Sequence, residues 1–234
     1  MAVTGTIDTE LADFFHRGRK QIYKKGEIIL RAGDTPQGIY LIESGYIKIY
    51  ALSNDATEHS HLFYLPGDIF PIIWAFTDAV RNVYYEAMQE TVVWLVAKDE
   101  FKAFADSHAH VAVSLLEQAV NMFRLYAGRI DNLLYSNSHE RTAYYLLSIM
   151  DRLGEKQPDG SWLVKVPVTH QDIANSVSLS RETVSRCMER LQRKDIIAYD
   201  SSRRIIIRDI AALAKSIGRD EAVGMWPYLS EYPE

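Results

Sequence analysis

The chain has 234 residues, of which 47% are hydrophobic, and a net charge of −5. This length allows one large domain or two ordinary ones, and we predict two. The longest apolar run, Ile69 to Phe76, is far short of the roughly 20 residues that a membrane-spanning helix needs. We expect a cytoplasmic protein without a membrane span, because the N-terminal segment also lacks the pattern of a secretory signal.

Short β-type runs separated by turns fill the region from Gln21 to about Val96. Turn signals such as Gly33-Asp34 and Ser44-Gly45 supply residues that tolerate tight-turn backbone angles. The runs cover residues 27–30, 38–42, 45–50, 61–65 and 91–96. This spacing predicts an antiparallel barrel or jelly roll.

After a short helix start at Asp99, the apolar period changes to about three and a half residues. The apolar residues of this seam are Val113, Leu116, Val120, Phe123, Ala127, Ile130 and Leu134. A heptad pattern of this length predicts a helix that pairs with a second copy of the chain. The alternative is an amphipathic helix that packs on its own domain.

A second helix is expected to begin at Ser138 and end near Gly154, followed by a turn and a strand from Trp162 to Val166. The segment that starts at Thr169 then reads THQDIANSVSLSRETVSRCMERLQRKDII. Its small and apolar positions fit a helix-turn-helix, with Ala174 at the helix contact and Ser178 in the turn. The predicted buried face consists of Ile173, Val177, Leu179, Val184, Cys187 and Leu191.

The second helix of this motif displays candidate base-reading side chains. Ser180 can cap it, which leaves Arg181, Glu182 and Arg186 exposed on its first turns. Arginine can donate two hydrogen bonds to guanine, and glutamate can accept from the amino group of cytosine. Glu182 can also hold Arg186 in position, although the same pair fits a solvated surface ion pair.

Two β-rich runs, 196–200 and 204–208, follow this helix and predict a wing hairpin with a basic tip. Arg203 and Arg204 at this tip are expected to contact DNA phosphates. The segment from Lys165 to Arg208 has nine basic and five acidic residues, a net +4, whereas the remainder carries −9. This uneven distribution favours a DNA-binding module beside an acidic domain.

Four parts of the chain together resemble the Crp/Fnr family, the regulators related to the cyclic-AMP receptor protein and the fumarate-nitrate reduction regulator. These parts are the block SRETVSRCMERL, the segment PDGSWLVKVPVTHQDIA before it, the heptad helix and the glycine-punctuated roll. The resemblance extends to about Asp209. It implies an α+β fold: an antiparallel β-roll sensor domain (1–108), a dimerisation helix (109–136), a winged helix-turn-helix (137–210) and a C-terminal tail (211–234).

The resemblance also implies a homodimeric transcription regulator, not an enzyme, that binds double-stranded DNA and RNA polymerase. Arg181, Glu182 and Arg186 match base-reading positions for TGTGA-like half-sites in an inverted repeat. The positions that match phosphate contacts are Thr169, His170, Gln171, Ser180 and Thr183. Because His170 replaces a frequent arginine, its phosphate contact is expected to be weaker or dependent on pH.

The roll lacks the residues by which family members bind cyclic nucleotides. Ile72 stands where the ribose-binding glutamate belongs, and Asn82-Val83 replaces the phosphate-binding Arg-Ser or Arg-Thr pair. Burying a phosphate without a paired cation is costly, so we do not expect cyclic AMP to bind. The aromatic residues of this region fit either a plain core or an apolar effector pocket around Phe70, Trp74, Tyr84 and Tyr85.

Four further points stay open at this stage. His59 and His61 resemble the paired ligands of metal-dependent jelly-roll enzymes, but no suitably placed third histidine follows in the roll. Cys187 fits a small buried core residue better than a redox sensor. A constitutive architectural DNA binder is an alternative to a regulator, and the tail could either dock on the body or contact a partner.

Overall fold

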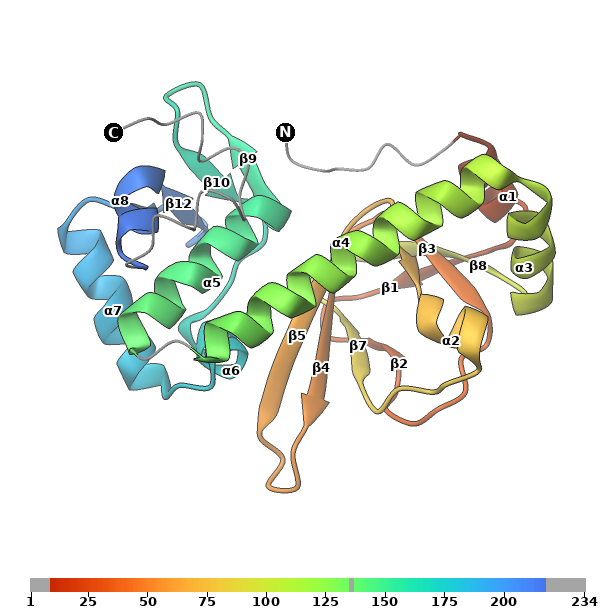
Figure 1. Ribbon diagram of the computed structural model, residues 1–234, viewed down its shortest axis with the longest axis horizontal. Helices are drawn as coiled ribbons and strands as arrows, with labels where there is room; N and C mark the ends of the chain where they lie inside the picture. Colours follow the sequence, from red (N-terminus) through yellow and green to blue (C-terminus); the bar gives the residue numbers. More distant parts are fainter. Residues whose placement is uncertain (1–8, 135–136, 218–234) are drawn as a thin grey trace. The chain divides into compact units, whose positions relative to one another are not determined.

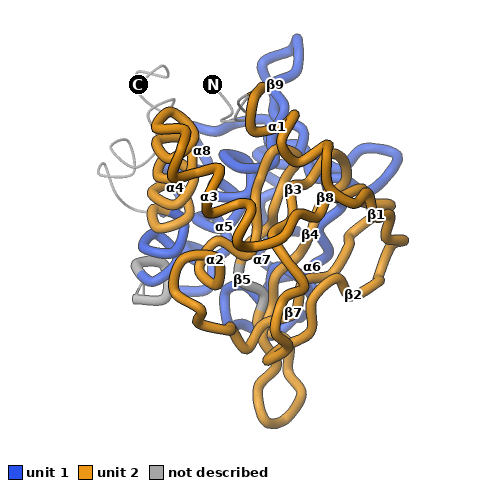
Figure 2. The backbone as a smooth tube through the Cα atoms, turned by 90° about the vertical axis from the view of Figure 1, so that its right-hand side faces the viewer, with its two compact units in different colours: residues 1–3, 125–234 blue, residues 4–124 orange. Residues whose placement is uncertain are grey.

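The computed structural model describes residues 9–134 and 137–217, apart from the side chains of 60, 61 and 131–134. The described residues form two compact units that meet in the sequence between Arg124 and Leu125, within one long helix (Figure 2). The first unit is mostly β and the second mostly helical (Figure 1).

The first unit is a β-roll built from two four-stranded antiparallel sheets. One sheet has the order β1-β8-β3-β6 and the other has the order β2-β7-β4-β5. The strands are β1 (Arg19–Tyr23), β2 (Ile28–Leu30), β3 (Ile39–Ser44), β4 (Ile47–Leu52), β5 (Glu58–Tyr64), β6 (Ile69–Phe70), β7 (Tyr84–Ala87) and β8 (Thr91–Val96). The prediction of an antiparallel roll is therefore confirmed, and the expected run 91–96 coincides with β8.

Alternating residues of the strands fill the core of the roll. In β8, for example, Thr91 and Val93 are buried whereas Val92 and Trp94 are partly exposed. The Phe70 ring stacks on Tyr40 at 5.0 Å and on Tyr85 at 5.2 Å between ring centroids. Aromatic residues of this region thus contribute to an ordinary packed core.

Gly45 lets β3 turn tightly into β4. It has φ +89°, and an added Cβ would lie 2.6 Å from the Cα of Thr91. A side chain here would therefore clash with the neighbouring strand as well as strain the backbone.

Four helices complete this part of the chain: α1 (Thr9–His16), α2 (Ile72–Thr77), α3 (Lys98–Ser107) and the long α4 (Ala109–Leu134). Phe15 of α1 and Phe101 of α3 are fully buried against Val111 and Leu115 of α4. The sequence pattern did not predict α2, which forms within the apolar run 69–76.

Helix α4 has two different faces. Val111 and Leu115 are buried against the roll and Met122 is also buried, whereas most of the heptad seam is exposed to solvent. Gln118 lies at the edge of the buried face, where its Nε2 donates to the Ile69 carbonyl at 2.9 Å and its Oε1 accepts from the Ile69 N–H at 3.3 Å. A helix of this length extends over about 39 Å.

The second unit contains a helical core and a small sheet with the strand order β11-β12-β10-β9. Its elements are α5 (Ser138–Leu153), β9 (Gly154–Lys156), β10 (Trp162–Val164), α6 (His170–Val177), α7 (Arg181–Arg193), β11 (Ile197–Tyr199), β12 (Ile205–Ile207) and α8 (Ile210–Lys215). Helix α5 begins at Ser138 as expected, with Asn137 as its N-cap. The helix-turn-helix and the hairpin that follows it are confirmed.

The first part of the expected tail belongs to this unit. Helix α8 contacts α5, and its Leu213 is fully buried. Residues 218–234, which include Trp226, Pro227 and Tyr228, lie outside the described part of the chain.

Candidate nucleic-acid interface

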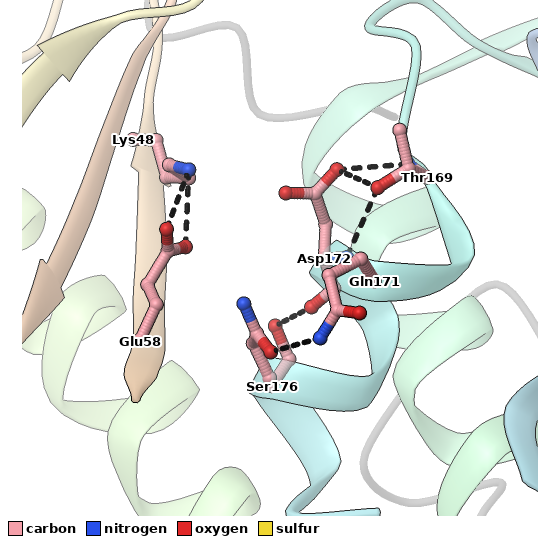
Figure 3. A network of polar contacts seen from close by, with 7 residues as sticks. Lys48, Glu58, Thr169, Gln171, Asp172 and Ser176 are labelled. Carbon is pink, nitrogen blue, oxygen red and sulfur yellow. Dashed lines mark hydrogen bonds and ion pairs between the residues drawn. The ribbon is translucent and has the colours of Figure 1, made fainter. Parts of the chain in front are cut away.

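A reciprocal capping box fixes the start of α6. The Thr169 hydroxyl accepts from the Asp172 N–H at 3.1 Å, and the Asp172 carboxylate accepts from the Thr169 N–H at 2.9 Å. Figure 3 shows this pair beside Gln171 and Ser176, whose hydroxyl donates to the Asp172 carbonyl at 2.8 Å. The cap is exposed on one side, so the first turn of α6 presents Thr169 and Gln171 to solvent.

The turn between the two helices depends on Ser178. This residue adopts the left-handed conformation, with φ 53° and ψ 50°, and its N–H donates to the Ala174 carbonyl. Glycine is the commoner choice for such a conformation. Ala174 itself is buried. Its small side chain lets α6 and α7 pack closely, whereas a larger one at this point would separate them.

Helix α7 buries one face and displays the other. The Ser180 hydroxyl accepts from the Thr183 N–H at 3.2 Å, which confirms the expected cap. The buried side chains are Val184, Cys187, Met188 and Leu191. Arg181, Glu182 and Arg186 are all exposed on the first two turns of the helix.

The contacts of the exposed side chains of α7 differ from those expected from the sequence. Arg186 donates to the Thr183 hydroxyl at 3.4 Å and, among the described residues, makes no ion pair with Glu182. Hydrogen bonds from its own backbone N–H and from Ser180 lower the pKa of the Glu182 carboxyl, with a smaller contribution from the charges of Arg181 and Arg186. The glutamate therefore stays ionised and able to accept hydrogen bonds.

His170 is half-buried and contacts two other elements. Its Nδ1 lies 2.9 Å from the Ser185 hydroxyl on α7, and its Nε2 lies 2.9 Å from the Tyr199 hydroxyl on β11. Burial, followed by the positive charge of Arg181, lowers the pKa of the imidazole below its ordinary value, against a smaller opposing effect of Glu189. The sequence alone did not indicate these contacts.

The wing consists of β11, β12 and the turn between them. Asp200 organises this turn: its carboxylate accepts from the N–H of Ser202 at 2.9 Å and of Arg204 at 2.8 Å. The same carboxylate forms an ion pair with the Arg204 guanidinium at 2.8 Å. Arg203 is exposed at the tip with φ 59°. The two arginines expected to contact phosphate therefore differ in their surroundings. Arg204 is paired with Asp200, whereas Arg203 extends from the hairpin without this ion pair.

The heptad seam of α4 is an exposed apolar stripe in the single chain. Val113, Leu116, Val120, Phe123 and Ile130 are all more than half exposed, with Phe123 at 73%. Ala127 is partly exposed, and the side chain of Leu134 lies outside the described residues. Large apolar side chains in a continuous row on one helix face are typical of a protein interface.

The four candidate effector residues do not line one common pocket. Phe70 and Tyr85 belong to the packed core, whereas Tyr84 points to the other side of β7 and stacks on Tyr50 at 5.3 Å. Trp74 and Tyr85 line an open, shallow pocket whose lining includes neither Phe70 nor Tyr84. The Lys98 ammonium lies 4.5 Å from the Trp74 ring centroid.

The remaining candidate residues are His59 and His61 in the roll and Cys187 in α7. His59 is partly exposed in β5, and the side chain of His61 is not described. Within the described residues, no three histidine, cysteine, aspartate or glutamate side chains are grouped so that they could hold a metal. Cys187 is buried, with its Sγ 3.9 Å from the Ser138 hydroxyl. None of the helices in the described ranges 9–134 and 137–217 could span a membrane.

A β-roll followed by a long helix and a winged helix-turn-helix defines a class of two-domain DNA-binding regulators. Residues 20–108 match the cyclic nucleotide-binding domain family, and residues 140–216 match the Crp-like helix-turn-helix domain family. The chain belongs to the Crp/Fnr family and is a DNA-binding transcription regulator of that type.

Curated relatives and solved structures agree with this assignment. The chain is 28% identical over 200 residues to the nitrogen fixation regulation protein FixK of Azorhizobium caulinodans, which covers 85% of this chain and 79% of the relative. It is 27% identical over 208 residues to the fumarate and nitrate reduction regulatory protein of Yersinia pestis, covering 86% and 79%. The structure of FixK2 from Bradyrhizobium japonicum has a TM-score of 0.71 at 26% identity, covering 85% of this chain and 96% of that one.

Proposed function

We propose that this regulator binds, as a homodimer, an inverted repeat of TGTGA-like half-sites and reads their bases with Arg181, Glu182 and Arg186. The observation that carries this proposal is the joint exposure of these three side chains on the first turns of α7, whose opposite face is buried. Arginine suits the two acceptors of guanine, and an ionised glutamate accepts from cytosine. The side chains therefore suit the G·C-containing steps of such a half-site.

Phosphate contacts would position this helix in the major groove. Thr169 and Gln171 at the start of α6, and Ser180 and Thr183 at the start of α7, are hydroxyl or amide side chains beside helix N-termini, which attract phosphate oxygens. Arg203 adds a cation at the wing tip. Arg204 is expected to contribute less, because Asp200 already neutralises part of its charge.

The dimer would form through the apolar stripe of α4. The stripe is too regular and too exposed to be explained by packing within one chain, since the opposite face of α4 already covers the roll. Two copies of α7 in such a dimer would bind half-sites about one helical turn apart, which fits an inverted repeat.

The roll is not expected to bind cyclic AMP. Helix α2 occupies the segment that would supply the ribose-binding glutamate, and its residues include no carboxylate. Asn82 is exposed and Val83 buried, so this pair offers no cation to a phosphate. If the roll has an effector, we place it at the pocket lined by Trp74 and Tyr85, whose lining also includes Arg31 and Arg81, and a ligand that raised the melting temperature would support this assignment.

In-vitro selection from a random DNA pool tests the proposal directly. Purified protein should enrich a TGTGA-like inverted repeat without ligand, and cyclic AMP should leave the enrichment unchanged. Enrichment that required cyclic AMP would contradict the assignment of the roll, and enrichment of an unrelated motif would contradict the roles of the three base-reading residues. In-vitro transcription from a selected site would then separate a regulator that contacts RNA polymerase from a purely architectural DNA binder.

A further inference from the structure

One histidine ring connects three elements of the DNA-binding module, α6, α7 and β11. His170 is the first residue of α6, and its two nitrogens reach Ser185 in α7 and Tyr199 in β11, each at 2.9 Å. Ser185 precedes the base-reading Arg186, and Tyr199 precedes the turn that carries Arg203. The ring therefore lies between the recognition helix and the base of the wing.

The two contacts favour a neutral imidazole ring, in which the single N–H and the acceptor nitrogen each have a hydroxyl partner. A neutral imidazole has one donor and one acceptor nitrogen, and each hydroxyl can supply whichever partner is needed. Both contacts are partly buried, and burial together with Arg181 favours this neutral form. A phosphate contact by His170 would require the ring to leave at least one of these hydroxyls.

We propose that His170 is a positioning residue for DNA binding, which holds the wing against the recognition helix through Tyr199 and Ser185 and does not itself contact phosphate. This inference rests on the proposed DNA-binding function. Through the ring, the placement of the Arg203 guanidinium at the wing tip is tied to the placement of Arg186 in the groove. Ile205 and Ile207 of the wing sheet are fully buried, so we expect their hydrophobic contacts to keep the fold intact when the ring is changed.

Tyr199→Phe tests the proposal with little risk to folding, because it removes only one hydroxyl. Binding to the selected DNA site is measured between 50 and 200 mM salt, with far-UV circular dichroism and the melting temperature as folding controls. We expect about fivefold weaker binding, the effect of one lost hydrogen bond on wing placement. Ser148→Ala is a control, since among the described residues the Ser148 hydroxyl bonds only to Tyr145 within its own helix α5.

The link to the wing is tested by combining variants. If His170 and Tyr199 position Arg203, Tyr199→Phe should reduce the slope of log K against log salt, as Arg203→Ala does. In a protein that already carries Arg203→Ala, Tyr199→Phe should have no further effect on this slope. His170→Gln, whose amide can still approach Tyr199, should bind more tightly than His170→Ala.

A different set of results would overturn the proposal. Unchanged binding by Tyr199→Phe and Ser185→Ala, together with a salt slope reduced in His170→Ala, would make His170 a phosphate ligand instead. A double-mutant cycle between His170→Ala and Tyr199→Phe in urea unfolding gives a readout that needs no DNA, and zero coupling there would also refute the contact. Failure of the wild-type protein to select any DNA, with coupling present, would instead contradict the proposed function.

Discussion

The apolar stripe of α4 can be tested by truncating its most exposed member, Phe123→Ala. A buried phenylalanine removes about 200 Å² from water, so the 73% of Phe123 that is exposed in the single chain corresponds to about 150 Å². At about 25 cal/mol per Å², burial of this area would stabilise a dimer by up to about 3.5 kcal/mol per subunit. If each subunit loses only half of that value in the variant, the two subunits together still lose about 3.5 kcal/mol. A loss of this size raises the dissociation constant of the dimer more than 100-fold.

Sedimentation velocity over a range of protein concentrations measures this change. Alanine is the better helix former, so Phe123→Ala should leave the melting temperature of the subunit nearly unchanged while dimerisation weakens. Asn121→Ala is the matched control, because Asn121 is partly exposed on the same helix and occupies a b position, away from the a and d positions of the stripe. If Phe123→Ala dimerised as tightly as the control, the stripe would not be the dimer interface.

Three further outcomes are expected. Arg186→Ala should lose about 1–3 kcal/mol of binding free energy per half-site and relax base preference at one position of the selected site, whereas uniform weakening across all sequences would identify a phosphate contact. Arg203→Ala should leave base preference unchanged and reduce the slope of log K against log salt by about 0.9 per subunit, and an unchanged slope would remove the wing tip from the interface. The free energy of unfolding should fall as pH drops below about 6.5, because burial, followed by the charges of Arg190 and Lys194, lowers the pKa of His139 in the folded chain, so the unfolded chain binds the proton first. Urea unfolding at pH 7.5 and 5.5 should show a smaller difference for His139→Gln than for the wild type, and an equal difference would exclude this histidine.

Regular periodicity made much of the fold predictable. The β-type run 91–96, rich in β-branched residues, coincides with β8, and the expected helix start at Ser138 and cap at Ser180 agree with the beginnings of α5 and α7. Helix α2 was not predictable, because a short run of uninterrupted apolar residues has no period that distinguishes a helix from a strand. Strand β1 is an edge strand whose exposed residues include Arg19 and Lys20, so it shows no apolar alternation.

Side-chain contacts between elements were the least predictable part of the site. His170 and Tyr199 are 29 residues apart, and nothing in their local sequence indicates that they meet. The Glu182 and Arg186 pair has the spacing of a helical ion pair, yet Arg186 reaches Thr183, three residues away, instead. The pairing of Arg204 with Asp200 likewise depends on the turn geometry that brings the two together.

The Gln118 amide has a consequence for the solubility of the roll. Strand β6 ends its sheet, and an unpaired edge of this kind can add a strand from another molecule and so begin aggregation. The Gln118 side chain offers Ile69 the same donor and acceptor that an incoming strand would offer. Helix α4 therefore closes this border of the sheet, and the charged residues of β1 protect the opposite border.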